Sequence, residues 1–219
     1  MIRALVFDFD GLILDTETPV FQSWQEIYAS HGCQLDLEKW VINIGKGVDD
    51  FDPVVDLEQL LGRRLNRERL DSRRRKHERA LVEAQPILPG VKDYLRDARI
   101  LGLKVGLASC SSREWVTSHL RRLELLKYFD CIRAAEDAQS LKPDPELYQK
   151  ALDCLGVQPG QAVAFEDSPY GILAARQAGL YCVFVPNPLS RQSPVDHADM
   201  HLDSLGDMPL KELIRKIGA

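Results

Sequence analysis

Short runs of consecutive apolar residues recur along the chain, and amphipathic stretches follow most of them. An unbroken apolar run is typical of a strand that is buried on both faces of a parallel sheet. An amphipathic stretch is typical of a helix that covers such a sheet, so the pattern predicts an α/β fold. The predicted strands are 4–7, 105–108, 131–134, 162–165 and 181–185. The predicted helices are 21–32, 54–62, 67–84, 91–102, 115–126 and 168–179.

The alternation of strands and helices is interrupted once, between the first and the second predicted strand. Nearly a hundred residues lie there, far more than the roughly dozen that a crossover connection needs. Helical patterns fill most of this interval, and the turn-rich sequence PILPG at 86–90 ends it. We therefore predict a helical insert that sits over the strand ends. The predicted domains are an α/β core of residues 1–15 and 86–219 and an all-helical cap of residues 16–85.

Composition and charge argue against several classes of function. Hydrophobic residues make up 45% of the chain and charged residues 28%, which is typical of a globular protein. The net charge of -5 gives no reason to expect a nucleic acid or an anionic membrane as a partner. No apolar run approaches the roughly 20 residues of a membrane-spanning helix. Acidic residues interrupt the first apolar run, so no signal peptide is predicted.

The cysteines bear on the redox state and the compartment of the protein. They are odd in number and scattered, and no C-x-x-C occurs. This pattern favours reduced thiols over a framework of disulfides. Reduced thiols are typical of the cytoplasm, so a cytoplasmic location is expected. The cysteines are Cys33, Cys110, Cys131, Cys154 and Cys182.

Polar and charged side chains follow four of the predicted strands. Because the carboxyl ends of parallel strands meet at the same edge of a sheet, we expect these side chains to lie close together. A single acid after a strand is usually a helix cap or a solvated turn, and Ser168 is already predicted to cap the helix after the fourth strand. Their joint occurrence indicates a functional site. The residues are Asp8 and Asp10 after the first strand, Ser109 after the second, Lys142 after the third, and Glu166 and Asp167 after the fourth.

The charges of these residues indicate the ligand. At about 4 Å and an effective dielectric constant of about 20, each pair of like charges costs on the order of 4 kcal/mol. A bound divalent cation relieves this repulsion among the carboxylates, and ligands that are all oxygen suit Mg²⁺. Lys142 and Ser109 then remain for a second anion, and a phosphoryl group fits a lysine, a hydroxyl and a metal. The sequence therefore predicts Mg²⁺-dependent phosphoryl chemistry.

The two aspartates after the first strand are predicted to have different roles. Asp8, directly at the strand end, is placed to attack phosphorus and to form an aspartyl phosphate. Asp10 lies on the same side if the extended backbone continues, and it is placed to protonate the leaving alcohol and to deprotonate the attacking water. Phe9 between them is expected to point into the fold, and Gly11 is expected to allow a sharp turn.

Together these motifs resemble the haloacid dehalogenase superfamily, and most closely its phosphatase and β-phosphoglucomutase-like members. The resemblance covers the whole chain. It implies a Rossmann-like core with an inserted helical cap, and an Mg²⁺-dependent mechanism through an aspartyl phosphate. The motifs that carry it are D-F-D-G at 8–11, D-T-E at 15–17, the serine after the second strand, K-P-D-P at 142–145 and E-D-S-P-x-G at 166–171.

The resemblance also implies a role for each residue at the strand ends. The implied roles are Asp8 as nucleophile and metal ligand, Asp10 as general acid and base and as metal ligand through its carbonyl, Ser109 and Lys142 as phosphate-binding residues, and Asp167 and Glu166 as metal ligands.

Two departures from the family pattern favour phosphate hydrolysis over a sugar-phosphate mutase. Mutase-type members carry a histidine five residues after the aspartate that matches Asp15, and here that position is Val20. They also carry an arginine shortly after a cap glycine, where this chain has Lys46. A point charge does not replace the bidentate fork of an arginine. The residues predicted to contact the substrate are Gly45, Lys46 and Asp49 in the cap.

We therefore predict a phosphatase that acts on a small phosphorylated metabolite. One alternative is a mutase of the β-phosphoglucomutase type, which returns the phosphate to a reoriented substrate instead of to water. Another is a receiver-like module that accepts a phosphoryl group on an aspartate without catalytic turnover. The helical insert argues against such a module, which needs no cap. The sequence leaves the substrate and the oligomeric state open.

Overall fold

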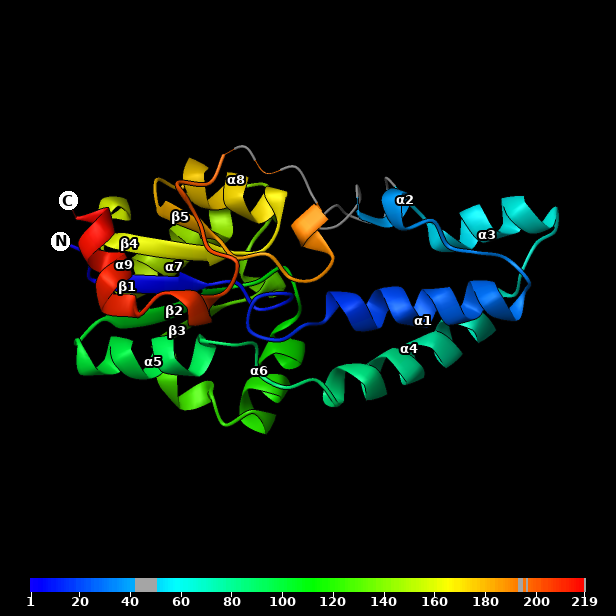
Figure 1. The fold of residues 1–219 in the computed structure, drawn as a ribbon, viewed down its shortest axis with the longest axis horizontal. Coiled ribbons are helices and arrows are strands. Elements are labelled where there is room, and N and C mark those ends of the chain that lie inside the picture. Colours follow the sequence, from blue (N-terminus) through cyan, green and yellow to red (C-terminus); the bar gives the residue numbers. More distant parts are fainter. Residues whose placement is uncertain (42–50, 193–194, 196, 219) are drawn as a thin grey trace.

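The computed structural model of the chain describes residues 1–41, 51–192, 195 and 197–218. It shows a sheet packed between helices and a second group of helices that extends from one end of the sheet (Figure 1). Both chain termini lie at the opposite end. The predicted substrate contacts Gly45, Lys46 and Asp49 lie outside the described residues.

The described residues form a parallel sheet of six strands in the order β3–β2–β1–β4–β5–β6. β1 is central, and the chain builds one side of the sheet with β2 and β3 before it returns to add β4 on the other side. The carboxyl ends of β1 and β4 are therefore the point where the strand order reverses, which is where such sheets bind ligands. The strands are β1 (Ala4–Phe7), β2 (Lys104–Ala108), β3 (Cys131–Arg133), β4 (Ala162–Glu166), β5 (Tyr181–Phe184) and β6 (Met200–His201).

The five strands that the apolar runs predict are confirmed to within one residue at each end. They read as unbroken apolar runs because both faces of the sheet are covered. Along β1, Leu5 and Phe7 belong to the hydrophobic cluster on one face, and Ala4 and Val6 belong to the cluster on the other. The two-residue strand β6 is not predicted, because it has no apolar run.

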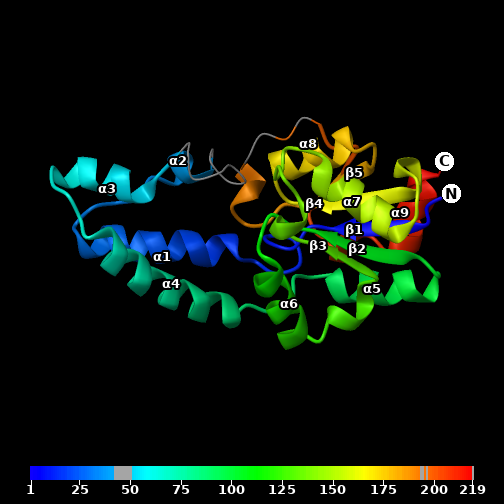
Figure 2. The same ribbon diagram turned by 180° about the vertical axis from the view of Figure 1, so that it is seen from behind.

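Helices cover both faces of the sheet, and Figure 2 shows the second face from behind. Of these helices the sequence predicts α5, α6 and α8. At the start of α8 the Ser168 hydroxyl accepts a hydrogen bond from the Gly171 amide at 3.2 Å, so the predicted cap is confirmed. One face carries α5 (Val91–Ile100), α6 (Arg113–Arg122) and α9 (Leu210–Ile217), and the other carries α7 (Glu146–Leu155) and α8 (Pro169–Gln177).

The inserted helices have a hydrophobic core of their own. α1 and α4 lie side by side, and α3 and α2 pack at the far end and along one side of α1 (Figure 1). Trp24 lies in this core and Trp40 and Phe51 pack against it, so these aromatic residues hold the insert together. The helices are α1 (Glu17–Ser30), α2 (Leu37–Val41), α3 (Pro53–Leu61) and α4 (Arg67–Glu83).

The predicted fold class, a Rossmann-like parallel-sheet core with an inserted all-helical cap, is therefore confirmed. The domain boundaries after residues 15 and 85 stay a prediction. Among the helices that the structure describes, none has both the length and the apolar character that a membrane crossing requires.

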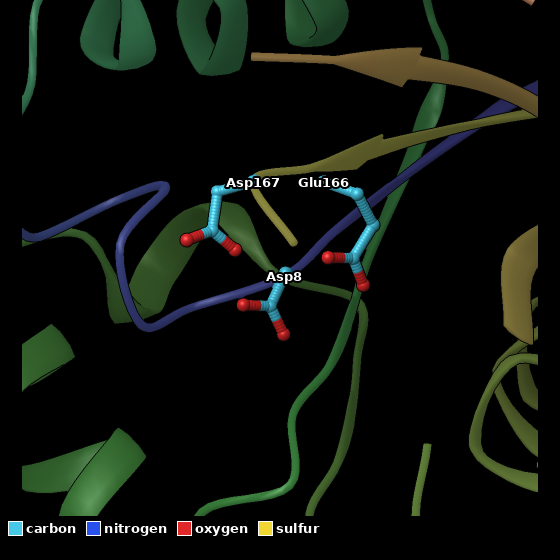
Figure 3. A group of neighbouring side chains, drawn as sticks. All are labelled: Asp8, Glu166 and Asp167. Carbon is cyan, nitrogen blue, oxygen red and sulfur yellow. The ribbon is translucent and has the colours of Figure 1, made fainter. Parts of the chain in front are cut away.

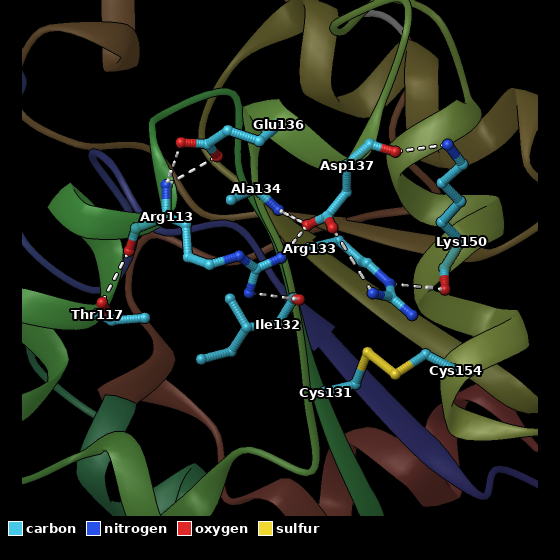
Figure 4. A network of polar contacts seen from close by, with 10 residues as sticks. All are labelled: Arg113, Thr117, Cys131, Ile132, Arg133, Ala134, Glu136, Asp137, Lys150 and Cys154. Atoms are coloured by element: carbon cyan, nitrogen blue, oxygen red, sulfur yellow. Dashed lines mark hydrogen bonds and ion pairs between the residues drawn. A yellow bond between two sulfur atoms is a disulfide. The ribbon is translucent and has the colours of Figure 1, made fainter.

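The expectation of reduced thiols throughout is wrong for Cys131 and Cys154, which form a disulfide between β3 and α7 (Figure 4). These elements pack side by side and bring the two Cα atoms to 6.2 Å, within the range of disulfides. The 23-residue separation gives no hint of this contact. Cys33, Cys110 and Cys182 are free thiols. The cytoplasmic location stays a prediction, without the support of uniformly reduced cysteines.

Candidate active site

The polar residues predicted at the strand ends lie together at one edge of the sheet. Asp8, Asp10, Ser109, Lys142 and Asp167 all line one cavity of about 490 Å³. Glu166, the sixth predicted residue, is fully buried at the end of β4 and lies beside Asp8 and Asp167.

Three of the carboxylates form a close group. Asp8, Glu166 and Asp167 each offer an oxygen that lies within 4.8 Å of the others (Figure 3). Asp8 is 7% exposed, Asp167 3% and Glu166 0%, so water does little to screen their mutual repulsion. A set of buried carboxylate oxygens fits a hard divalent cation, because such ions prefer oxygen ligands and bring the opposing charge.

Lys142 neutralises only part of this charge. Its ammonium donates hydrogen bonds to Asp8, to Glu166 at 2.7 Å and to the Ala108 carbonyl at 2.8 Å. Burial would lower the pKa of Lys142, but the carboxylates of Asp8 and Glu166 outweigh it and raise the pKa above its usual value. The lysine therefore stays charged at the bottom of the cavity.

The pKa values of two of the acids show that Lys142 does not offset all of the negative charge. Burial raises the pKa of Asp8 to about 8, although Lys142 lowers it. Burial, reinforced by the charges of Asp8 and Glu166, also raises the pKa of Asp167 well above its usual value. In the protein alone these carboxyls resist ionisation, and a further cation beside them would favour their charged forms.

Asp10 is not part of this close group. Its carboxylate accepts hydrogen bonds from the Ser111 hydroxyl at 2.6 Å, the Trp115 indole at 2.9 Å and the Ser109 hydroxyl at 3.4 Å. These donors fix the carboxylate on the side of the cavity where α6 begins. A metal contact through the backbone carbonyl of Asp10 stays a prediction.

Sequence reasoning missed Ser111 and Trp115. Ser111 lies in the same stretch, ASCSS at 108–112, as the predicted Ser109. The second hydroxyl in this stretch could have indicated a further site residue. Trp115 reaches Asp10 from the first turn of α6, and nothing in an isolated tryptophan indicates that its N–H faces an acid. Phe9 is fully buried, as predicted.

Gly11 makes room for Asp167. Its φ of +74° favours glycine, and a β-carbon there would lie 2.1 Å from the Asp167 carboxylate. The same carboxylate accepts a hydrogen bond from the Asn187 amide at 2.7 Å. Asn187 is itself fixed, because its carbonyl oxygen accepts hydrogen bonds from the amides of Leu189 and Ser190 at 2.8 Å each. Sequence reasoning missed Asn187, which lies in a Pro-Asn-Pro loop without a motif.

We expect Gly11→Ala to destabilise the fold by at least about 2 kcal/mol, because left-handed strain adds to a clash with the buried Asp167 side chain. Urea unfolding measures the effect. The matched control is Gly102→Ala: its φ of +67° carries the same strain, but nothing lies within 4 Å of the added carbon. Equal losses of stability in the two variants would show that Gly11 leaves no special room for Asp167.

The cap closes the cavity from the other side. Thr16, Glu17 and Val20 from the start of α1 and Glu78 from α4 line it, opposite Tyr170 of α8. Thr16 and Glu17 belong to the D-T-E motif, whereas sequence reasoning did not select Glu78 or Tyr170. The side chain of Glu78 is only 20% exposed and reaches the cavity.

Comparisons with known proteins find matches over most of the chain. The model of a family described as haloacid dehalogenase-like hydrolase matches residues 5–185. YhcW of Bacillus subtilis, which is named as a phosphatase, is 44% identical over 98% of this chain and 97% of its own length. Hexitol phosphatase B of Escherichia coli is 33% identical over 97% of both chains. The crystal structure of CbbY from Rhodobacter sphaeroides in complex with phosphate covers 94% of this chain and 96% of its own, with a TM-score of 0.72 and 28% identity. The matches span the cap as well as the sheet.

Proposed function

Since the chain belongs to the haloacid dehalogenase-like hydrolase family and is a phosphoric monoester hydrolase, we propose that it hydrolyses a small phosphorylated sugar or polyol, with Mg²⁺ and through an aspartyl phosphate on Asp8. The observation that carries the proposal is the position of Asp8. Its carboxylate lies where the buried acids, the Lys142 ammonium and the cavity meet.

Asp8, Glu166 and Asp167 would hold the Mg²⁺, since their oxygens are the close group that needs a cation. The bound ion supplies positive charge that keeps Asp8 ionised and offsets the charge of the phosphoryl group. Lys142 fixes one oxygen of Asp8 and places a positive charge beside the phosphate. The Ser109 hydroxyl lines the same cavity and is available to the phosphoryl oxygens.

Two steps complete the reaction. In the first, a carboxylate oxygen of Asp8 attacks phosphorus, the bond to the leaving oxygen breaks, and Asp10 gives its proton to the departing alcohol. In the second, Asp10 takes a proton from water, which attacks the aspartyl phosphate and restores the Asp8 carboxylate. Ser111 and Trp115 hold Asp10 in position for both steps.

Val20 supports hydrolysis over the mutase alternative. It lines the cavity at the position where mutase-type relatives carry a histidine, and an alkyl side chain neither donates nor accepts a proton. The receiver-like alternative has less support, because two of the matched relatives are named as phosphatases and residues of the cap helices line the cavity. Gly45, Lys46 and Asp49 remain predicted substrate contacts.

The test of the proposed function is phosphate release from a panel of sugar, polyol and other small phosphomonoesters, with Mg²⁺ and with a chelator. We expect turnover of sugar or polyol phosphates that the chelator abolishes and added Mg²⁺ restores. Phosphate release that is unaffected by chelation would refute the Mg²⁺ requirement. Absence of release from every sugar and polyol phosphate would refute the substrate class.

We expect Asp167→Asn to raise the Mg²⁺ concentration for half-maximal activity by about tenfold or more, because a charged ligand is replaced by a neutral one. Titration calorimetry with Mg²⁺ alone gives an independent readout and is expected to show the same weakening. Asp203→Asn is the control, since that side chain is 74% exposed. An unchanged Mg²⁺ affinity in Asp167→Asn would remove Asp167 from the metal site.

A further inference from the structure

Two carboxylates from the cap face the place where the leaving group of a substrate must lie. Glu17 begins α1 and Glu78 lies in α4, and both line the cavity together with Val20. A substrate whose phosphoryl group meets Asp8 and Lys142 extends from the sheet edge toward the cap. Its alcohol part therefore meets these acids first.

Arg74 does not supply a positive charge to this part of the cavity. Its guanidinium forms an ion pair with Glu78, four residues further along α4, and lies 4.8 Å from the ring centroid of Trp24 in the cap core. The side chain of Arg74 is only 13% exposed. Arg74 therefore fixes the position of the Glu78 carboxylate. Arg74 itself is not among the described residues that line the cavity.

The other described residues of the lining do not offset the acids either. Among the described residues that line the cavity, Lys142 is the one lysine or arginine, and its ammonium already meets Asp8 and Glu166. Five carboxyl groups line the same cavity as Lys142. The positive charge of a bound divalent cation would be balanced by the negative charge of the phosphoryl group. The five are Asp8, Asp10, Glu17, Glu78 and Asp167.

The crowding of acids shows in the titration of Glu17. Burial, followed by the charges of Asp10, Asp15 and Glu78, raises the pKa of Glu17 to about 7. Carboxylate oxygens accept hydrogen bonds, which matches the hydroxyl groups of a polyol. A second anion in the same place would add to an already unfavourable repulsion.

We propose that Glu17 and Glu78 determine the specificity for the leaving group: they accept an uncharged, hydroxyl-rich alcohol and exclude a substrate that carries a second phosphate or a carboxylate. The inference rests on the proposed function and adds the charge of the substrate to it. Its physical basis is that specificity arises from a repulsive element against the wrong ligand as well as from contacts with the right one.

The first test compares three substrates of similar size on the Mg²⁺-loaded wild-type protein. They are sorbitol 6-phosphate, which has a neutral leaving group, 6-phosphogluconate, which adds a carboxylate, and fructose 1,6-bisphosphate, which adds a phosphate. We expect kcat/KM for sorbitol 6-phosphate, whose leaving group is uncharged, to exceed that for either more highly charged competitor by at least about thirtyfold. Comparable values for all three in an active enzyme would overturn the inference and leave the proposed function intact. No phosphate release from any substrate would instead refute the proposed function.

The second test changes the acids themselves. We expect Glu78→Gln to reduce the preference for sorbitol 6-phosphate over 6-phosphogluconate by about tenfold, mainly through a lower KM for the anionic substrate, because it removes one charge and releases Arg74. The matched control is Glu83→Gln. Glu83 lies on the same helix and pairs with Arg79 through side chains that are 54% and 65% exposed, so the preference is expected to stay unchanged.

Glu17→Gln provides an independent variant should Glu78→Gln fail to fold, which circular dichroism would reveal. It is expected to weaken the same preference without a matching change in Mg²⁺ affinity. A folded variant of either acid that keeps the wild-type preference would show that its charge does not select the substrate.

Discussion

We expect Asp8→Asn to lower kcat by at least about four orders of magnitude while the protein stays folded. A carboxamide is a poor nucleophile, so the aspartyl phosphate cannot form at this position. The fold is expected to tolerate the change, because it removes one of several crowded acids and leaves Lys142 its ion pair with Glu166. Steady-state phosphate release and urea unfolding of the purified variant measure the two effects.

The matched control is Asp153→Asn, the same chemical change on an exposed part of α7. It is expected to keep wild-type turnover. Acid quenching during turnover gives an independent readout: the wild-type protein is expected to carry an acyl phosphate, and Asp8→Asn is not. Turnover of Asp8→Asn at a rate close to the wild type would place the nucleophile elsewhere and remove the basis of the proposed mechanism.

The core of the fold was predictable because its strands are buried on both faces. ALVF at 4–7 and AVAF at 162–165 have no polar residue, and this requirement comes from helices on both sides of the sheet. The elements that were missed lack such a signal. α9 follows a loop without a strong start signal, and its N-cap is Pro209, which makes no side-chain cap hydrogen bond.

The site was most predictable where the backbone alone places a residue. Asp8, Ser109 and Glu166 come directly after or at the end of a strand, so the topology brings them to one edge. Trp115 and Asn187 reach the same edge through side-chain rotamers and loop conformations. These depend on packing and leave no fixed spacing in the sequence.

Which residue of the cap helix α4 lines the cavity could not be predicted from the sequence either. The helical pattern of α4 was evident, but its register against the core decides which of the acids of this helix reaches the cavity. Glu78 does so and Glu83 does not, although both lie on one helix. The two positions are five residues apart, about 140° around an α-helix, so they face different sides of α4. Arg74 packs over Trp24 and pairs with Glu78, a contact between two cap helices that composition cannot reveal.

We expect Asp10→Asn to slow both chemical steps, each by about two to four orders of magnitude, because the same carboxyl group is the acid in the first and the base in the second. The amide oxygen can still accept the hydrogen bond from Trp115, so the position of the side chain is expected to persist. The variant therefore separates proton transfer from positioning. Single-turnover kinetics on an alkyl phosphate measure the first step directly.

An aryl phosphate distinguishes the two steps in Asp10→Asn, since its leaving group departs without a proton. With such a substrate we expect the first step to recover while the second stays slow, so that phosphoenzyme accumulates on Asp8 and one equivalent of the phenol is released in a burst. In the wild-type protein Asp10 still activates the water, so no comparable accumulation is expected. If Asp10→Asn instead released phenol and phosphate together, without a burst, the base catalysis would belong to another group, and Asp10 would act only on the leaving oxygen. We expect the better leaving group to restore the first step and to leave the second step slow. That result would assign both proton transfers to the carboxyl group of Asp10.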